Sequence, residues 1–390
     1  MKNEIKIFLI LIVMFLFGYF VPFENEIIKR SFNEAFLMFQ DYTHQHILTC
    51  LIPAFFIAGA ISVFLSQASV IKYLGAQSKV WVSYSVASVS GTILAVCSCT
   101  VLPLFAGIYK KGAGLGPATA FLYSGPAINI LAIILTFKIF GVEMGTARII
   151  GAVCFAVIIG IIMGFLFRKE DKERLSDPSF GQTIQVDEIS LGKRLVHFVS
   201  LILLLIFASW GKPENDPTGF YTFMFDYKWY IAGFFLLIII LVSIFWFSKD
   251  QVKNWGESTW DFTKKVMPYL FAGVLVAGFL MGRPGHDALI PSNWIITFVG
   301  DNSIISNLIS TIFAAFMYFA TLTEVPIVQS LMGSGMAKGP ALALFLAGPA
   351  VSLPNMLVVR SILGTKKTLV YVLLTIILST IAGWIYGNLI

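Results

Sequence analysis

Two cysteines separated by one residue are the most reactive feature of the chain. The segment Cys97-Ser98-Cys99-Thr100 precedes Pro103, which removes a backbone donor and favours a helix break near Cys99. In an unwound stretch, the two thiols and the neighbouring hydroxyls can approach one substrate. Thiolates are soft ligands that prefer thiophilic centres to Mg²⁺ or Ca²⁺. The pattern indicates a site for a thiophilic substrate; the alternative is that the cysteines are merely small buried apolar side chains.

A single carboxylate stands in the corresponding place later in the chain. Glu324 follows Thr323 and comes two residues before Pro326, next to an apolar segment. An ionisable residue inside a membrane is costly and is by default a functional candidate. We therefore predict that Glu324 contacts substrate or couples transport to protons. The alternative is a helix cap that reaches an aqueous face.

An internal repeat relates these two regions. With an offset of 223 residues and no gap, Pro103 falls on Pro326, Gly116-Pro117 on Gly339-Pro340, and Gly125-Pro126 on Gly348-Pro349. The chain is therefore predicted to consist of two homologous halves. Their four prolines are expected to break helices four residues earlier, near Cys99, Leu122, Leu322 and Phe345. Discontinuous helices of this kind surround substrate sites near the bilayer midplane.

Two polar residues follow the Gly-Pro pairs. Asn129 comes shortly after Gly125-Pro126, and Ser352 comes shortly after Gly348-Pro349. We expect them either to line the substrate path or to satisfy freed backbone groups. Together with the cysteine segment, Thr323 and Glu324, they complete the predicted substrate-binding set, with the Gly-Pro pairs, Pro103 and Pro326 as its scaffold.

The composition places all of this in a membrane. Of the 390 residues, 57% are hydrophobic and 12% are charged, which leaves too little polar surface for a soluble enzyme. Apolar segments long enough to span a bilayer recur along the chain. They lie at about 5–22, 47–66, 80–97, 115–137, 146–167, 195–210, 229–247, 266–282, 303–321, 340–359 and 368–387. The chain is predicted to be an all-α, multi-pass protein of the cell membrane.

The charges indicate the organisation of the halves. We assign residues 1–167 to a first transmembrane half, 168–194 to a charged cytoplasmic linker and 195–390 to a second half. The linker is expected to be solvated, with docking of a soluble partner as the alternative. If segments 80–97 and 303–321 turn back within the membrane, 19 of the 27 Lys and Arg fall on one side. That arrangement makes the halves an inverted repeat, whereas eleven full spans would make them parallel.

Other classes of function lack support in the sequence. The basic residues form short clusters between apolar segments, so nucleic acid is not an expected partner. The histidines lack metal-site spacing, and no nucleotide-binding loop occurs. We predict no metal, no cofactor and no enzymatic activity, and the sequence predicts no oligomeric state.

The repeated segments also resemble a known family. The strings CSCTVLPLFAGIYKKGAGLGPATAFLYSGPAIN and EVPIVQSLMGSGMAKGPALALFLAGPAVSLPN are similar to those of the organoarsenical efflux permeases. The resemblance extends from about residue 45 to the C-terminus, and Thr100 stands where relatives often carry glycine. It implies export of trivalent organoarsenicals such as methylarsenite, with Cys97 and Cys99 near the path.

These observations predict a permease that works by alternating access. Methylarsenite has two exchangeable positions on arsenic, which matches two thiols, whereas arsenite would favour three. Cys50 and Cys154 are candidate third ligands only if the fold brings them close. The alternatives are a permease for another small molecule with structural cysteines, or a membrane thiol-disulfide oxidoreductase.

Overall fold

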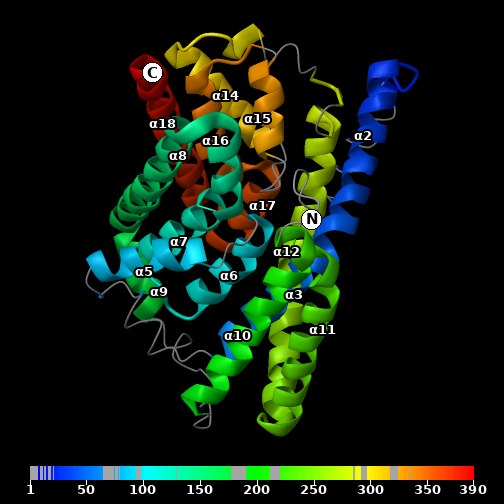
Figure 1. Cartoon of the computed structure of the whole chain (residues 1–390), viewed down its shortest axis with the longest axis vertical. Coiled ribbons are helices and arrows are strands. Elements are labelled where there is room, and N and C mark those ends of the chain that lie inside the picture. Colours follow the sequence, from blue (N-terminus) through cyan, green and yellow to red (C-terminus); the bar gives the residue numbers. More distant parts are fainter. Residues whose placement is uncertain are drawn as a thin grey trace.

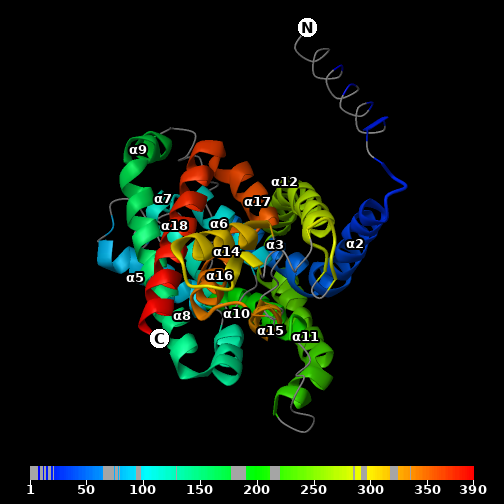
Figure 2. The same ribbon diagram turned by 90° about the horizontal axis from the view of Figure 1, so that it is seen from above.

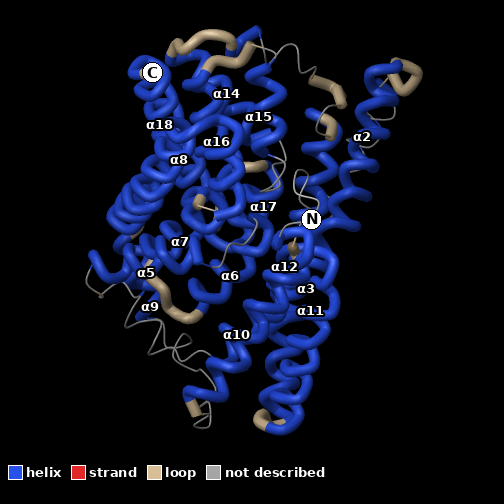
Figure 3. The backbone as a smooth tube through the Cα atoms, in the orientation of Figure 1, coloured by secondary structure: helices blue, strands red, loops and turns tan. Residues whose placement is uncertain are grey.

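The computed structural model describes residues 22–64, 80–93, 98–128, 130–176, 190–210, 220–283, 286–290, 297–316, 324–333 and 335–390, with residues 74 and 78 and scattered positions before residue 22. In these ranges the regular structure is entirely helical, without a strand (Figure 3). The predicted all-α fold is therefore confirmed.

The first half begins with three contiguous helical elements, residues 26–64, which we call the N-terminal rod, and continues with further helices. These elements are α2 (Glu26–Tyr42), the π-helix η1 (Thr43–Leu51), α3 (Ile52–Phe64), α5 (Val80–Ile93), α6 (Ser98–Lys110), α7 (Leu115–Ala127) and α8 (Ile130–Leu166). The helix α9 (Arg168–Ser176) follows at the start of the predicted linker.

The second half repeats this plan. Its elements are α10 (Leu191–Ala208), α11 (Phe220–Phe245), α12 (Lys249–Met281), α14 (Ile304–Phe316), α15 (Glu324–Gly333), α16 (Lys338–Val351), α17 (Leu353–Leu363) and α18 (Thr365–Leu389). From residue 47 onward, every predicted apolar segment contains a helix.

The surface of α18 shows that lipid, not water, is its solvent. Leu373, Ile377 and Ile381 recur every fourth residue and are exposed, whereas Thr375 and Ser379 on the other face are fully buried. Residues four apart share one face of a helix. An apolar outer face with hydroxyls inside is the reverse of a helix on a water-soluble protein.

Length and hydropathy support the same conclusion for several helices. In the described part of the chain, five helical stretches are long and apolar enough to cross a membrane: 47–64, 135–166, 222–245, 249–281 and 365–389. The pair α16 and α17, bent by 44° at its junction, gives up to six. The protein is thus a multi-pass membrane protein.

The 223-residue register of the sequence recurs in the helices. The helices α5, α6 and α7 correspond to α14, α15 and α16, and Leu115 and Lys338 open equivalent helices. Gly141 bends α8 at a φ of 84°, and Gly364 separates α17 from α18 at a φ of 83°. Side chains disfavour such positive φ values, so both bends depend on glycine. The α8 helix therefore matches α17 and α18 together.

A close helix crossing is also duplicated. Gly116 of α7 lies against Gly160 of α8, where an added Cβ would come within 2.8 Å of the Gly160 carbonyl oxygen. Their equivalents, Gly339 and Gly383, lie against each other in the same way, at 2.6 Å. Small residues let membrane helices approach until their backbones touch. The two halves thus share one packing scheme.

The predicted positions of the helix breaks were wrong for the Gly-Pro pairs. Pro126 and Pro349 lie inside α7 and α16, which continue past Leu122 and Phe345 and end just after each proline. A proline removes a single ladder hydrogen bond, which a helix tolerates close to its end. In α16, the Asn355 side-chain amide donates to the carbonyl of Pro349 at 3.0 Å.

The breaks before Pro103 and Pro326 differ from the expectation in another way. Pro103 lies inside α6, which begins at Ser98, and Pro326 is the third residue of α15. Pro103 is the sixth residue of α6, so the helix continues through it although the Cys99 carbonyl lacks the ladder hydrogen bond that a backbone N–H would give. The predicted break near Leu322 lies outside the described residues, as do residues 94–97 and the rest of 317–323.

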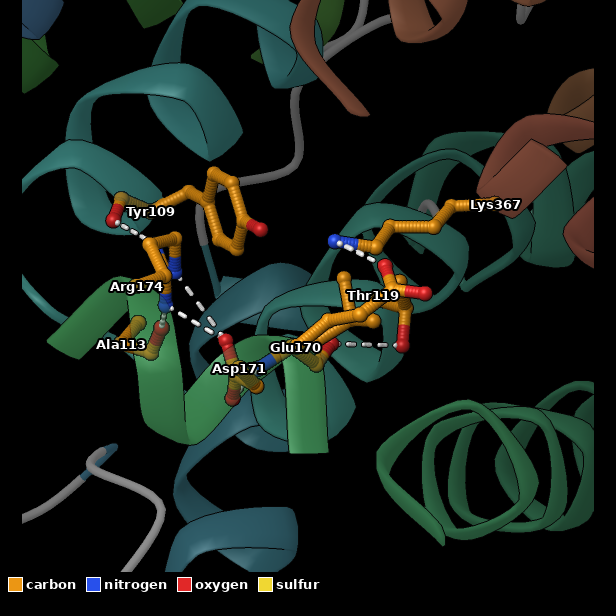
Figure 4. Close-up of polar contacts among 8 residues, drawn as sticks. Tyr109, Ala113, Thr119, Glu170, Asp171, Arg174 and Lys367 are labelled. Atoms are coloured by element: carbon orange, nitrogen blue, oxygen red, sulfur yellow. Dashed lines mark hydrogen bonds and ion pairs between the residues drawn. The ribbon is translucent and has the colours of Figure 1, made fainter. Parts of the chain in front are cut away.

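The beginning of the predicted linker is structured. In α9, Asp171 is buried and accepts a hydrogen bond from the Leu115 backbone N–H at 2.8 Å, which caps α7. Arg174 donates to the carbonyls of Tyr109 and Ala113, both at 2.7 Å. Figure 4 shows α9 lying across the turn between α6 and α7. Residues 168–176 thus bind the first half, rather than being fully solvated.

The same helix reaches the second half. Glu170 pairs with Lys367 at 3.1 Å and with Lys366 at 3.4 Å, at the start of α18 (Figure 4). These two hydrogen-bonded lysines lower the pKa of the Glu170 carboxyl, with Lys367 contributing most. Exposed pairs of this kind contribute little energy individually. Their value here is positional, because they place α9 between the two halves.

The N-terminal rod is fixed to α12 by an ion pair. The helices α2 and α12 lie side by side in both views (Figures 1 and 2). Arg283, just after α12, donates to Glu34 of α2 at 2.9 Å and contacts Asp41 at 3.3 Å. Burial raises the pKa of the Glu34 carboxyl, but the hydrogen bonds and charge of Arg283 outweigh it and hold the pKa below 4.5.

We expect Glu34→Gln to destabilise the protein in a pH-dependent way. A depressed pKa means that the carboxylate stabilises the fold above pH 4.5, and that this contribution is lost as pH falls through the lowered pKa. At neutral pH the substitution should cost about 1–3 kcal/mol, the range for a hydrogen bond to a charged group. Thermal unfolding in detergent across pH is the measurement. The exposed Glu26→Gln is the control, and a Glu34→Gln deficit that does not shrink in acid would contradict the assignment.

The glycine crossing gives a second test. Gly383→Leu should strongly lower the unfolding temperature, because its side chain would meet the Gly339 carbonyl at van der Waals overlap. Overpacking costs about 1–3 kcal/mol or more when backbone must move. Gly233→Leu in α11 is the matched control, since nothing lies within 4 Å of its added Cβ. Equal stability of the two variants would show that the crossing is not close-packed.

Candidate functional site

Equivalent positions of the two halves touch at the centre of the molecule. The Tyr123 hydroxyl of α7 donates to the Leu346 carbonyl of α16 at 2.9 Å. These residues are 223 apart, so each is the counterpart of the other in the repeat. Two related units bring a position close to its own counterpart only near the axis that relates them. The centre of the repeat therefore lies between α7 and α16.

A buried ion pair between the halves lies beside this contact. Arg148 of α8 is fully buried and contacts a carboxylate oxygen of Glu324, the first residue of α15. Another guanidinium nitrogen of Arg148 donates to the Thr136 hydroxyl at 2.9 Å. The Phe345 ring of α16 lies 4.7 Å from the guanidinium carbon. Each charge thus finds its counter-charge in the other half of the chain.

The ion pair leaves hydrogen-bonding capacity unused. Among the described residues, Arg148 Nε and Glu324 Oε2 have no partner, and neither does the buried Tyr371 hydroxyl of α18. Unpaired polar atoms in a buried site are costly, and buried polar networks are normally satisfied. Within the described part of the chain, Arg148 is therefore the partner of the carboxylate, and one carboxylate oxygen has none.

The repeat does not duplicate this pair. The counterpart of Glu324 is Val101, and the counterpart of Arg148 is Tyr371. Val101 and Tyr371 are both buried, so the equivalent place in the other half holds no charge. The centre of the molecule is therefore chemically asymmetric although its helices are duplicated.

The predicted substrate-binding residues occupy matched positions at helix starts. Ser98 and Cys99 are the first two residues of α6, and Thr100 follows them and is fully buried. Thr323 is the repeat counterpart of Thr100, and Asn129 is the counterpart of Ser352. Cys97, Asn129 and Thr323 lie outside the described residues. Ser352, at the junction of α16 and α17, is buried, and its hydroxyl has no partner in the described part of the chain.

Each of these helix starts belongs to a helix that packs on the opposite half. The cysteine-bearing α6 contacts α17, which begins just after Ser352. The Glu324-bearing α15 contacts α8, which begins just after Asn129. Each of these two helices therefore contacts the helix that follows the Gly-Pro pair of the opposite half.

The scaffold glycine of the first half permits close packing. A Cβ on Gly125 of α7 would overlap the Val101 side chain of α6. Pro103 and Pro126 lie in these two helices, and Pro326, Gly348 and Pro349 occupy the same places in α15 and α16. The scaffold set thus marks where α6 meets the end of α7.

The other two cysteines have different surroundings. Cys154 is exposed on α8, and Cys50 is buried in η1. Among the described residues, no three His, Cys, Asp or Glu side chains gather as a metal ion would require. Cys154 therefore does not supply an inward-facing third thiol.

Arg148 was missed by the sequence analysis, although a signal for it exists. It lies within the apolar segment 146–167, and charged residues inside such segments indicate functional sites. Its partner Thr136 and its counterpart Tyr371 carry no such signal, because hydroxyl residues are common in membrane helices.

Comparison with known proteins identifies the family. The ArsP_1 model, described as a predicted permease, matches residues 31–388. A UPF0718 protein of Methanocaldococcus jannaschii is 40% identical over 361 residues, 89% of this chain and 93% of that protein. The UPF0718 protein YraQ of Escherichia coli is 21% identical over 75% of this chain and 63% of its own length.

A further relative carries a more explicit name. A Streptococcus mutans protein called a putative two-component membrane permease complex subunit is 24% identical, over 81% of this chain and 83% of its own length. No solved structure matches the chain. The family match confirms the resemblance drawn from the repeated segments. The chain belongs to the ArsP_1 family of predicted permeases and is a multi-pass membrane permease.

Proposed function

We propose that this permease exports a small thiophilic substrate, in the first instance a trivalent organoarsenical such as methylarsenite. The observation that carries the proposal is the packing of two equivalent helices of the repeat on the opposite halves. The helix α6 contains Cys99 and packs on α17, and its counterpart α15 contains the buried Glu324 and packs on α8. Discontinuous helices at a repeat interface are the usual setting of transporter substrate sites.

The chemistry follows from the ligand types. Cys97 and Cys99 bind the soft trivalent arsenic of methylarsenite through two As–S bonds, and the two hydroxyl groups of methylarsenite leave as water with the protons of the two thiols. Ser98, Thr100 and Thr323 supply hydroxyls beside the same interruptions. Asn129 and Ser352 supply polar groups after the two Gly-Pro pairs. Two water molecules reverse this exchange: they restore the two thiols and release methylarsenite.

We further propose that the halves are inverted, as in many secondary transporters, and four ion pairs support that arrangement. Glu170 contacts Lys366 and Lys367, Glu34 contacts Arg283, and Lys338 approaches Glu143 at 4.0 Å. Eleven full spans would place the partners of each pair on opposite sides of the membrane. In Figure 1, moreover, α5 to α7 lie in the lower half of the molecule and α14 to α16 in the upper half.

This topology has a direct test. With a single cysteine introduced at Lys366 or at Lys338 in a Cys-free chain, we expect Lys366→Cys to be labelled by an impermeant maleimide from the cytoplasmic side. Lys338→Cys should be labelled from the opposite side. Eleven full spans with an external N-terminus predict the reverse for both positions, so right-side-out and everted vesicles together decide between the two.

A second subunit is part of the proposal. The Streptococcus mutans relative is named as one subunit of a two-component permease complex. The linker that joins the halves is the natural place for a soluble partner, because α9 already contacts both halves there. The competing functions are a permease for another small molecule and a thiol-disulfide oxidoreductase. A transport experiment with cysteine variants distinguishes them.

The transport prediction compares cysteine variants in everted membrane vesicles. The wild-type chain should accumulate methylarsenite in an energy-dependent way, and Cys97→Ala/Cys99→Ala should lose accumulation because the thiolates that bind arsenic are gone. Cys154→Ala is the matched control, since this cysteine is exposed on α8 and should transport normally.

The competing functions separate in the same experiment. Absence of accumulation by well-inserted wild-type protein would remove the arsenical assignment, and unimpaired transport by the double variant would make the cysteines structural. Trapping of a mixed disulfide between Cys97 or Cys99 and another protein would favour the oxidoreductase.

A further inference from the structure

The Arg148–Glu324 contact is the one fully buried ion pair in the described part of the chain. Both side chains are at most 2% exposed, whereas the other ion pairs each have at least one partner that is more than a tenth exposed. A buried ion pair adds little stability relative to apolar residues of the same size. Its retention at the centre of a permease therefore calls for a functional reason.

The two partners differ in what they can do when separated. An arginine side chain keeps its charge under all physiological conditions. A glutamate that leaves its counter-charge in a dry site becomes neutral by taking up a proton. Separation of the pair therefore leaves Arg148 charged and protonates Glu324. Formation of the pair drives the proton off.

The surroundings of Arg148 allow such a separation. When Glu324 withdraws, the guanidinium keeps the Thr136 hydroxyl at 2.9 Å and the Phe345 ring at 4.7 Å. A cation over an aromatic face remains favourable inside a protein. Among the described residues, Arg148 is the hydrogen-bond partner of the Glu324 side chain and the second carboxylate oxygen has none, so withdrawal of Glu324 breaks a single side-chain contact.

The remaining groups around the pair do not replace Arg148. Among the described residues, Tyr123 of α7 interacts electrostatically with Arg148 and with Tyr371 of α18. Both are buried phenols, and they are neutral at physiological pH. The counterpart position in the repeat holds Val101 and Tyr371, which supply no second carboxylate. One proton-binding group thus serves the two halves.

We infer that Arg148 and Glu324 form a proton-coupling site, in which Arg148 expels the proton from Glu324 in the conformation described here. The Glu324 carboxylic acid gives its proton to water on the side to which the site is open, and its carboxylate pairs with Arg148. In the opposite conformation the pair parts, and Glu324 takes one proton from the other side. This inference rests on the proposed transport function, because it makes export an exchange of substrate for one proton.

The transport test uses the purified full-length chain in proteoliposomes with a pH-sensitive dye inside. A methylarsenite gradient should move protons through the wild-type protein. Arg148→Gln should retain exchange of labelled methylarsenite but lose proton movement and pH-driven accumulation. Arg148→Lys, which keeps the charge, should restore both in part. Lys338→Gln, which removes an exposed ion pair between the halves, is the matched control and should behave as wild type.

A substrate-free measurement keeps the inference separate from the arsenical assignment. Infrared spectra at neutral pH should show a protonated carboxyl band in Arg148→Gln that is absent from wild type and from Arg148→Gln/Glu324→Gln. Size-exclusion elution identifies variants that fail to fold, and Arg148→Lys then replaces Arg148→Gln, with partial appearance of the band expected. Absence of the band in a folded variant, or proton movement that survives Arg148→Gln, would overturn the inference. The band without any methylarsenite transport would instead overturn the proposed substrate alone.

Discussion

A backbone polar group cannot be left unpaired against lipid, and this constraint governs the whole architecture. Helices that stop within a membrane expose carbonyls and N–H groups that only protein or enclosed water can satisfy. Every residue of α7 is buried, as is every residue of α16 from Gly339 onward. The long apolar helices α8, α11, α12 and α18 provide the lipid-facing shell. Interrupted helices thus become possible because continuous helices surround them.

The duplication of the chain provides this shielding of the short helices from lipid. Each half has one set of short helices. The inward-facing side of that set must pack against helices of similar length that also have polar ends. The second half supplies these helices, as the Tyr123–Leu346 contact between counterpart positions shows. The glycine crossings Gly116–Gly160 and Gly339–Gly383 keep the two sets at the same small spacing. The helices α6 and α15 then lie against the opposite half rather than against lipid.

The sequence predicted the repeat register to the residue, because glycine and proline have conformational roles that survive divergence. The paired bends at Gly141 and Gly364 and the paired helix starts at Leu115 and Lys338 follow that register. The helix breaks were placed too early in α7 and α16, since the effect of a proline depends on how close the helix end lies. The position of the helix end depends on how the helix packs against its neighbours, which a local sequence pattern does not record.

The central ion pair was predicted only by half, for a related reason. Glu324 was identified because it stands beside a proline in the repeat, whereas the sequence analysis did not single out Arg148. In the structure Arg148 lies inside α8, after the bend at Gly141. Its pairing with a residue 176 positions away depends on how the two halves dock, which no local pattern records.

Divergence at the centre gives the two halves different tasks. The repeat register places the cysteine segment opposite residues 320–323, which read Ala-Thr-Leu-Thr, and places Glu324 opposite Val101. If both halves carried an arginine and a glutamate, two buried ion pairs would resist separation at the same interface. The observed chain has thiols at one interruption and a single charge pair at the other. A soft ligand site and a proton-binding group are thereby joined by the same moving helices, while the rest of the duplicated scaffold stays symmetric.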